Sequence, residues 1–208
     1  SDDIIPTDAY SMMVETLDQT GSDFSVGRAV RFKGSRYWFP DFSVKAHDRE
    51  RLATNIREYP EAMFDILACN RVYRRDFWNR EIGEFPEGML YEDHAPSTDA
   101  YLRAHSFDML QHTTYDWRER EDKSSITQQN HLLDNLRSRI KASDLAQICI
   151  ERCGDRSVLT AWSGRVIAMG FTEYIQFATN GSAEYRDTLQ AWIRKIYELA
   201  PEEAFSYA

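Results

Sequence analysis

The chain has 208 residues, of which 42% are hydrophobic and 28% are charged. This length suits one domain with an appendage or two small domains, and it is enough to bury a substantial core. The 34 acidic residues outnumber the 25 basic ones, so the formal net charge of −9 argues against broad nucleic-acid binding, which needs a basic face. No apolar run approaches the roughly 20 residues that span a bilayer, and we expect neither a membrane span nor a signal peptide.

The chain begins with Ser1-Asp2-Asp3 and no initiator Met, which indicates a segment of a longer protein. A first helix is expected at residues 7–21, where Gly21 suits the helix end. Its predicted buried face carries Tyr10, Met13, Val14 and Leu17 at helical spacing. Alternation predicts two extended segments after it, at residues 23–27 and 29–32.

Residues 36–40 read Arg-Tyr-Trp-Phe-Pro and predict an aromatic loop. Trp38 there could stack on a sugar or polyol acceptor, or it could simply pack on the core, and amphipathic aromatic residues serve both purposes. A short helix at 60–68 and a strand at 70–75 are expected next. Arg71 and Arg74 alternate to opposite faces of that strand, and arginines in strands are usually surface residues.

The most informative stretch is residues 85–96, which reads Phe-Pro-Glu-Gly-Met-Leu-Tyr-Glu-Asp-His-Ala-Pro. Its prolines and glycine predict a turn, an extended run at 89–91 and a helix at 97–104. Glu92 and Asp93 fall at this strand-to-helix junction, where side chains can project into a crevice. Adjacent residues on an extended backbone point to opposite sides, so one acid can face substrate while the other braces a loop or caps the helix. His94 could assist a base, but a hydrogen-bonded bystander at the helix start is favoured.

Short strands are expected at 106–110 and 114–120. The second presents Arg118 and Arg120 on one face, and the loop after it carries Lys123, Ser124 and Ser125. Guanidinium groups and serine hydroxyls match phosphate oxygens well. A mobile phosphate-binding loop is therefore one interpretation, and a solvated hairpin end is the other.

About four amphipathic helices are expected from residue 128 onward. Packing of these helices on the preceding domain, or self-association, is favoured over docking on a membrane surface, because their basic residues are not gathered on one face. Cys149 and Cys153 lie four apart there without a nearby histidine, so buried thiols are favoured over a metal pair. The odd count of three cysteines fits a reducing compartment and predicts a cytoplasmic protein.

Four blocks of this sequence resemble, in order and at compact spacing, the second half of the bacterial family 2 glycosyltransferases of the GT-A fold. The blocks begin at Cys69-Asn70-Arg71, Phe85-Pro86-Glu87-Gly88, Tyr91-Glu92-Asp93 and Tyr115-Asp116-Trp117-Arg118-Glu119-Arg120, the last followed by Ser125-Ile126-Thr127. The resemblance implies an α/β fold: a partial GT-A domain with a Rossmann-like mixed sheet at residues 1–127, and an all-α extension at 128–208. It also implies that a nucleotide-binding half lies upstream.

The resemblance assigns expected roles to residues. Asp93 would be the catalytic base, with Glu92 beside it, and Asp2 and Asp3 would be the remnant of an Asp-x-Asp motif that holds Mg²⁺ or Mn²⁺. The diphosphate would contact Arg118, Arg120, Ser124 and Ser125. Substrate contacts are expected from Trp38, Asn70, Arg71, Arg74 and His94.

The expected function is transfer of a sugar, with inversion, from a nucleotide-sugar donor to the hydroxyl of a glycan or polyol-phosphate acceptor in cell-envelope or teichoic-acid-type polymer synthesis. Peripheral contact with the inner face of the membrane and self-association through the helical extension stay open, and no nucleic-acid partner is expected. A carbohydrate- or partner-binding module that retains the fold without catalysis is the alternative. A hydrolase that uses Glu92 and Asp93 is less favoured, because it needs a second acid about 5 to 9 Å from the first.

Overall fold

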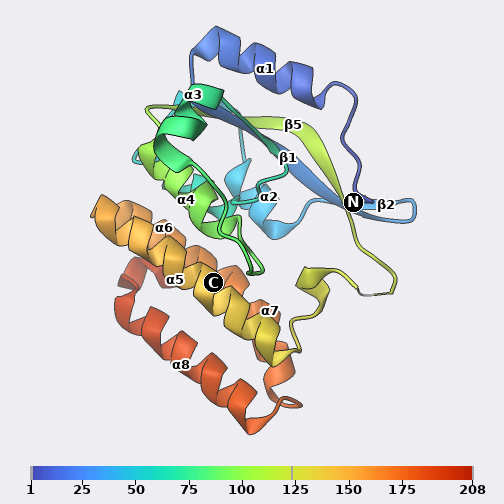
Figure 1. Ribbon diagram of the computed structural model, residues 1–208, viewed down its shortest axis with the longest axis vertical. Coiled ribbons are helices and arrows are strands. Elements are labelled where there is room, and N and C mark those ends of the chain that lie inside the picture. The colour runs from blue at the N-terminus through green and yellow to red at the C-terminus, as the bar shows by residue number, and fades with distance from the viewer. Residues whose placement is uncertain (1, 123, 208) are drawn as a thin grey trace.

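The computed structural model describes residues 2–122 and 124–207. At its centre is a five-stranded mixed sheet with the order β2-β1-β5-β3, in which β4 also pairs with β1 (Figure 1). β1 and β5 are parallel neighbours, and the other pairs are antiparallel. The strands are β1 (Phe24–Lys33), β2 (Arg36–Trp38), β3 (Arg51–Thr54), β4 (Arg71–Tyr73) and β5 (Phe107–Arg118).

β1 and β5 are each one long strand, although the sequence predicts two short ones in each place. The pairing of β1 with β5 runs from Phe24 opposite Phe107 to Phe32 opposite Arg118, with register shifts on either side of Arg28. At Gly27 a β-carbon would collide with the side chain of Thr114, so only glycine allows the two strands to approach there. The break between the two predicted segments 23–27 and 29–32 therefore marks an irregularity inside β1 and not the end of a strand.

Helices cover both sides of the sheet. α1 (Ala9–Thr20) lies along β1 and β5 on one side, and α2 (Asp41–Ala46) and α4 (His94–Arg103) lie on the other (Figure 1). α1 ends at Gly21 as predicted, with φ 74°. Of its predicted buried face only Met13 and Leu17 are buried, whereas Tyr10 and Val14 are exposed.

The segments between β3 and α4 differ from prediction. The helix expected at 60–68 is the 3₁₀ turn η1 (Pro60–Phe64), and the strand expected at 70–75 is the shorter β4, because α3 (Arg75–Phe77) and the π-helical turn η2 (Trp78–Ile82) follow at once. α4 begins at His94 and so includes Pro96 in its first turn, three residues earlier than predicted. The aromatic loop expected at 36–40 contains β2.

The C-terminal part is helical. It contains η3 (Ile126–Gln128), α5 (Leu133–Cys153), α6 (Arg156–Arg165), the π-helical turn η4 (Val166–Phe171), α7 (Thr172–Ala178), α8 (Ala183–Leu199) and η5 (Glu202–Tyr207). Side chains cap two of these helices: Asp155 accepts from the backbone of Ser157 and Val158, and Ser182 accepts from that of Tyr185. Cys149 and Cys153 are free and only half-buried, so these thiols are less buried than predicted.

One apolar core joins the sheet to the helices. Phe24 and Phe107 of the sheet belong to the same buried cluster as Leu136 of α5, Trp162 of α6 and Trp192 of α8. The helical part therefore packs on the sheet-containing part, which was one of the two arrangements expected from the sequence. No helix in the described ranges is both long enough and apolar enough to cross a membrane.

Candidate active site

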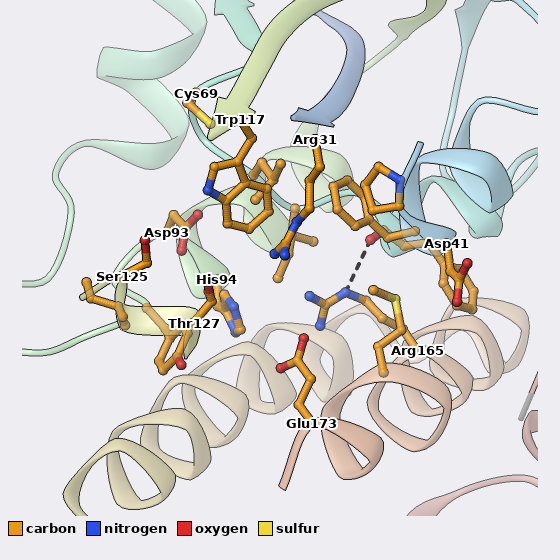
Figure 2. A pocket seen from close by; sticks show the side chains of 18 of the residues that line it. Arg31, Asp41, Cys69, Asp93, His94, Trp117, Ser125, Thr127, Arg165 and Glu173 are labelled. Carbon is orange, nitrogen blue, oxygen red and sulfur yellow. Dashed lines mark hydrogen bonds between the residues drawn. The ribbon is translucent and has the colours of Figure 1, made fainter. Parts of the chain in front are cut away.

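A cleft of about 700 Å³ lies where the sheet-containing part meets the C-terminal helices. Arg31 of β1 and Trp117 of β5 enter it from the sheet, and Arg165 and Glu173 face them from the helices (Figure 2). The sequence-predicted residues in its lining are Trp38, Glu92, Asp93, His94, Arg120, Ser124 and Ser125. The cleft thus brings together the acidic turn that carries Glu92 and Asp93, the aromatic segment at Trp38 and the loop between β5 and η3.

Asp93 lies in this cleft directly before α4, but its side chain makes no capping bond to that helix. One carboxylate oxygen, Oδ2, instead accepts a hydrogen bond from the backbone of Ala68 at 3.4 Å. Burial raises the pKa of Asp93, and the neighbouring carboxylate of Glu92 raises it further. A carboxylate with a raised pKa is a stronger proton acceptor once ionised, which suits a general base.

The turn that presents Glu92 and Asp93 has a strained backbone at Tyr91. Residues 89–91 are not the extended run predicted, because Tyr91 has φ 60°, in the left-handed region. A non-glycine residue there costs on the order of 1–2 kcal/mol, so contacts elsewhere must hold it. The buried Tyr91 hydroxyl donates to Asn135 Oδ1 at 2.9 Å, and the guanidinium of Arg139 lies 4.9 Å from the ring centre. Both partners come from α5, so the helical part holds the acidic turn in place.

Asn135 also connects that turn to the end of the loop that follows β5. Its Oδ1 accepts a second hydrogen bond, from the Tyr174 hydroxyl at 2.7 Å, and its Nδ2 donates to the carbonyl of Ile126 at 2.9 Å. One buried amide of α5 therefore bonds to α7, to the loop that follows β5 and to Tyr91.

His94 lines the cleft and is bonded to Arg139. Its Nε2 lies 2.8 Å from Nη1 of Arg139, and because a guanidinium only donates, Nε2 is the acceptor and the ring is neutral. Burial, together with the charges of Arg139 and Arg165, lowers the pKa of His94 well below its ordinary value. This is the hydrogen-bonded histidine that the sequence favoured over a base-assisting one.

The acidic start of the chain contacts the end of β5. Arg120 donates to Asp2 Oδ1 at 2.9 Å and to Ser124 Oγ at 3.2 Å. Asp3 accepts from the Tyr115 hydroxyl at 2.6 Å and from the backbone of Arg118 at 2.9 Å. The residues predicted for metal and for diphosphate therefore lie together, although Lys123 of the predicted loop is outside the described residues.

Asp2 and Asp3 offer carboxylate oxygens, which a hard cation prefers, but they are only two ligands. Within residues 2–122 and 124–207 no three His, Cys, Asp or Glu side chains come together as a metal cage. Magnesium needs no such cage, since it often binds one or two carboxylates and takes its other oxygens from phosphate and water. Asp2 is exposed and ion-paired with Arg118 and Arg120, so a cation would share it with these arginines.

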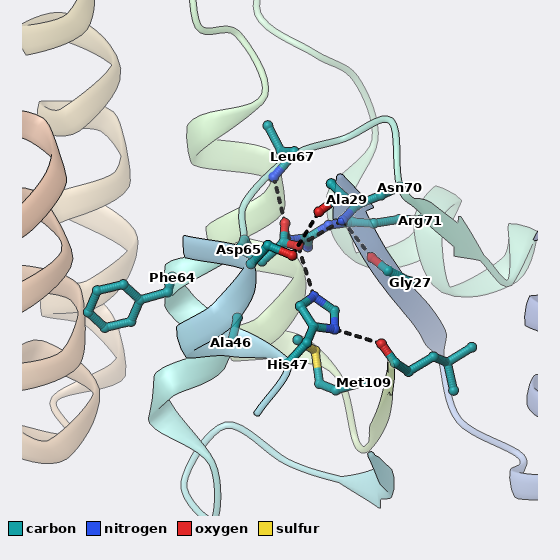
Figure 3. A network of polar contacts seen from close by, with 12 residues as sticks. Gly27, Ala29, Ala46, His47, Phe64, Asp65, Leu67, Asn70, Arg71 and Met109 are labelled. Carbon is teal, nitrogen blue, oxygen red and sulfur yellow. Dashed lines mark hydrogen bonds and ion pairs between the residues drawn. The ribbon is translucent and has the colours of Figure 1, made fainter. Parts of the chain in front are cut away.

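Asn70, Arg71 and Arg74, predicted to contact substrate, are absent from the cleft lining and bond to the framework. Asn70 is fully buried and donates to the Gly27 carbonyl and to Asp65, each at 2.7 Å (Figure 3). The buried Arg71 donates to the Asp65 carbonyl and to the Tyr101 hydroxyl. Arg74 donates to the carbonyls of Ser22 and Leu17, next to the end of α1. These residues order the strands below the site.

Sequence reasoning missed the charged residues of the cleft that come from β1 and the helices: Arg31, Asp41, Arg139, Arg165 and Glu173. A signal for two of them exists. Arg139 follows the buried Leu136 by three positions, and Arg165 follows the buried Ala161 and Trp162 by four and three. An arginine at the core-facing spacing of a helix needs an explanation, because buried arginine is rare unless it is paired.

Comparison with known proteins identifies the fold. No protein-family model and no curated protein sequence matches this chain. Solved structures of S. aureus TarS do. TarS 1–349 with UDP has a TM-score of 0.69 at 15% identity, covering 100% of this chain and 56% of that one. TarS 1–349 with UDP-GlcNAc has the same TM-score and identity, with 58% of that chain covered.

The chain shares its fold with these TarS structures. A mixed α/β sheet of partial GT-A type is joined to a helical part, as the sequence resemblance implied. The chain spans a little over half of the TarS 1–349 structures, and 34% of a longer TarS structure that it matches with a TM-score of 0.69 at 14% identity.

Proposed function

We propose that this chain is the acceptor-side half of a glycosyltransferase that moves a sugar from a nucleotide-sugar donor to an acceptor hydroxyl. The observation that carries the proposal is the Asp93 carboxylate, which has a raised pKa and lies in a large cleft on a glycosyltransferase-like fold. TarS, a teichoic-acid glycosyltransferase that was solved with UDP and UDP-GlcNAc, supports a UDP-sugar donor and a role in cell-envelope polymer synthesis.

The reaction we propose is a single displacement with inversion. The Asp93 carboxylate accepts the proton of the acceptor hydroxyl, the hydroxyl oxygen bonds to the anomeric carbon, and the bond from that carbon to the diphosphate breaks. Arg120, with Ser124 and Ser125 beside it in the cleft lining, contacts the diphosphate as it leaves. Trp38 and Phe39 form an aromatic wall that suits the acceptor chain.

A divalent cation, Mg²⁺ or Mn²⁺, belongs to the proposal and would be held by Asp2 and Asp3. When bound, it would neutralise charge on the diphosphate. In the complete protein, Asp2→Ala and addition of EDTA should each weaken donor binding. Calorimetry that finds the affinity for UDP unchanged by both treatments would remove the metal from the proposal.

Mass spectrometry of the acceptor tests the function. The complete protein, incubated with Mn²⁺, a panel of UDP-sugars and a polyol-phosphate oligomer, should add single sugar units to the oligomer and release UDP. Binding of UDP-sugar and oligomer without any mass increase would favour the alternative, a binding module that retains the fold.

A further inference from the structure

Three arginines from different elements converge in the cleft beside Asp93. Arg31 comes from β1, Arg139 from α5 and Arg165 from α6 (Figure 2 shows Arg31 and Arg165). Glu173 of α7 is their common carboxylate: it lies 3.6 Å from Arg139 and acts electrostatically on Arg31 and Arg165. Glu173 therefore acts on all three guanidinium groups. Asp93 and Asp65 also act on Arg165, and Glu119 also acts on Arg31.

Among the described residues, protein acceptors satisfy only part of the N–H donors of Arg31 and Arg165. In the described part of the chain, Nε of Arg31 is buried without an acceptor, and its guanidinium lies 4.1 Å from the centre of the Trp117 ring. Arg165 is 8% exposed, and its hydrogen bond runs from Nε to the Phe64 carbonyl at 3.4 Å. The terminal amino groups of Arg165 point toward Arg31 and Glu173 across the cleft (Figure 2). Donors from two walls are thus aimed at one space.

Holding these charges together costs folding free energy. Burial, together with the charge of the neighbouring Arg139, lowers the pKa of Arg165 to about 9. Burial also lowers the pKa of Arg31. Buried cations that lack matching anions are unfavourable, so an anionic ligand would relieve the imbalance. Arginine forks fit phosphate oxygens better than any other side chain does.

We propose that Arg31 and Arg165, with Arg139 behind them, bind a phosphate group of the acceptor. This inference rests on the proposed function and assigns the residues that would hold a phosphate of its polyol-phosphate acceptor. Ser125 and Thr127 of the loop proposed for the donor diphosphate lie beside Asp93, whereas Arg31 and Arg165 lie on its other side, toward Asp41 (Figure 2). A phosphate held there would place a neighbouring polyol hydroxyl at Asp93. The helical part then supplies a substrate-binding group and not only support.

Calorimetry with two probes, glycerol 3-phosphate and UDP, tests the site on the complete protein. Arg165→Gln and Arg31→Gln should each weaken binding of glycerol 3-phosphate by about tenfold or more, which corresponds to a lost charge-assisted hydrogen bond. Binding of UDP should stay within about twofold. Arg137→Gln is the matched control, because Arg137 lies on α5 but outside the cleft lining and pairs with Glu184 on the surface. It should change neither affinity.

The other outcomes overturn the assignment in different ways. Weaker UDP binding with unchanged glycerol 3-phosphate binding would give these arginines to the donor diphosphate. Unchanged binding of both probes would remove the anion site altogether. Arg165→Gln should leave the thermal unfolding midpoint equal or higher, since it removes a buried charge, and a large fall with loss of both ligands would show a structural role. If the wild type transfers no sugar but binds glycerol 3-phosphate through Arg165, the proposed function fails while the anion site stands.

Discussion

Asp93 has neighbours that act on its pKa in opposite directions. Burial and the carboxylate of Glu92 raise the pKa, and the guanidinium of Arg139 lowers it. A base must be ionised to accept a proton, so activity should fall as the pH drops through the pKa of Asp93. The acid limb of the pH–rate profile should therefore follow the pKa of Asp93, and a change at Glu92 should move it.

Glu92→Gln should shift that acid limb to lower pH. Removing the negative charge of Glu92 favours ionisation of Asp93, so the pKa of Asp93 falls. The measurement is kcat/KM for transfer over a pH range of about 4 to 8. Glu87→Gln is the control, because Glu87 is exposed and outside the cleft lining. A limb that stays in place or moves to higher pH would argue against Asp93 as the base.

The buried carboxylate of Asp65 leads to a second prediction, which concerns the stability of the fold. Burial alone would raise its pKa, but the hydrogen bond and charge of His47 and the charge of Arg71 outweigh burial and lower it (Figure 3). Asp65→Asn would leave Arg71 buried without its partner at 3.5 Å, and we expect the free energy of unfolding in urea to fall by about 3–5 kcal/mol at neutral pH. Asp134→Asn, at an exposed pair with Arg137, should cost less than about 1 kcal/mol.

The pH dependence of that difference provides the check. Because the folded pKa of Asp65 lies below the unfolded one of about 4, its ionised form stabilises the fold above that pH, and this contribution is lost as the pH falls through the folded pKa. The gap between wild type and Asp65→Asn should therefore shrink in acid. Equal stability of the two proteins at neutral pH would show that the network contributes little.

Among the elements, the acidic turn depends most on contacts from elsewhere in the chain. Prolines, glycine and adjacent carboxylates predicted the turn and its position before a helix. They did not predict that Tyr91 would adopt a positive φ, because the groups that hold it, Asn135 and Arg139, lie more than 40 residues away on α5. Likewise the long β1 was predicted as two strands, because the close approach of Gly27 to Thr114 involves a distant strand.

Tyr91→Phe should lower kcat by about tenfold and leave the affinity for UDP unchanged. The variant keeps the ring but loses the hydroxyl that bonds to Asn135, so the strained turn is less well held and Asp93 is less well placed. Steady-state kinetics and calorimetry separate the two effects. Tyr197→Phe is the control, because Tyr197 is 66% exposed on α8. Wild-type kcat in Tyr91→Phe would mean that the hydroxyl bonds do not position the base.

At the scale of the whole molecule, the sheet and the helices share one core and one cleft. The resemblance to the family 2 glycosyltransferases implied the α/β class, and amphipathic spacing predicted the helical C-terminal part. The expected boundary at residue 127 falls in η3. Residue patterns could not show that one cluster of buried apolar residues includes both Phe24 of β1 and Trp192 of α8. Nor could they show that Arg139 and Arg165 enter the cleft, because amphipathic spacing identifies a buried face without saying what lies opposite.

The continuous core predicts that residues 1–208 unfold as one cooperative unit. Differential scanning calorimetry should give a single transition whose calorimetric and van't Hoff enthalpies agree. Two separate transitions, one for the sheet-containing part and one for the helices, would instead support two independent domains.

Asp93→Asn in the complete protein tests whether Asp93 removes the proton of the acceptor hydroxyl in glycosyl transfer. The substitution keeps size and polarity but removes the proton acceptor, so turnover should fall by about 10²–10⁴ while the dissociation constant for UDP-sugar stays within a few-fold of wild type. Transfer within a few-fold of the wild-type rate would show that Asp93 is not the base.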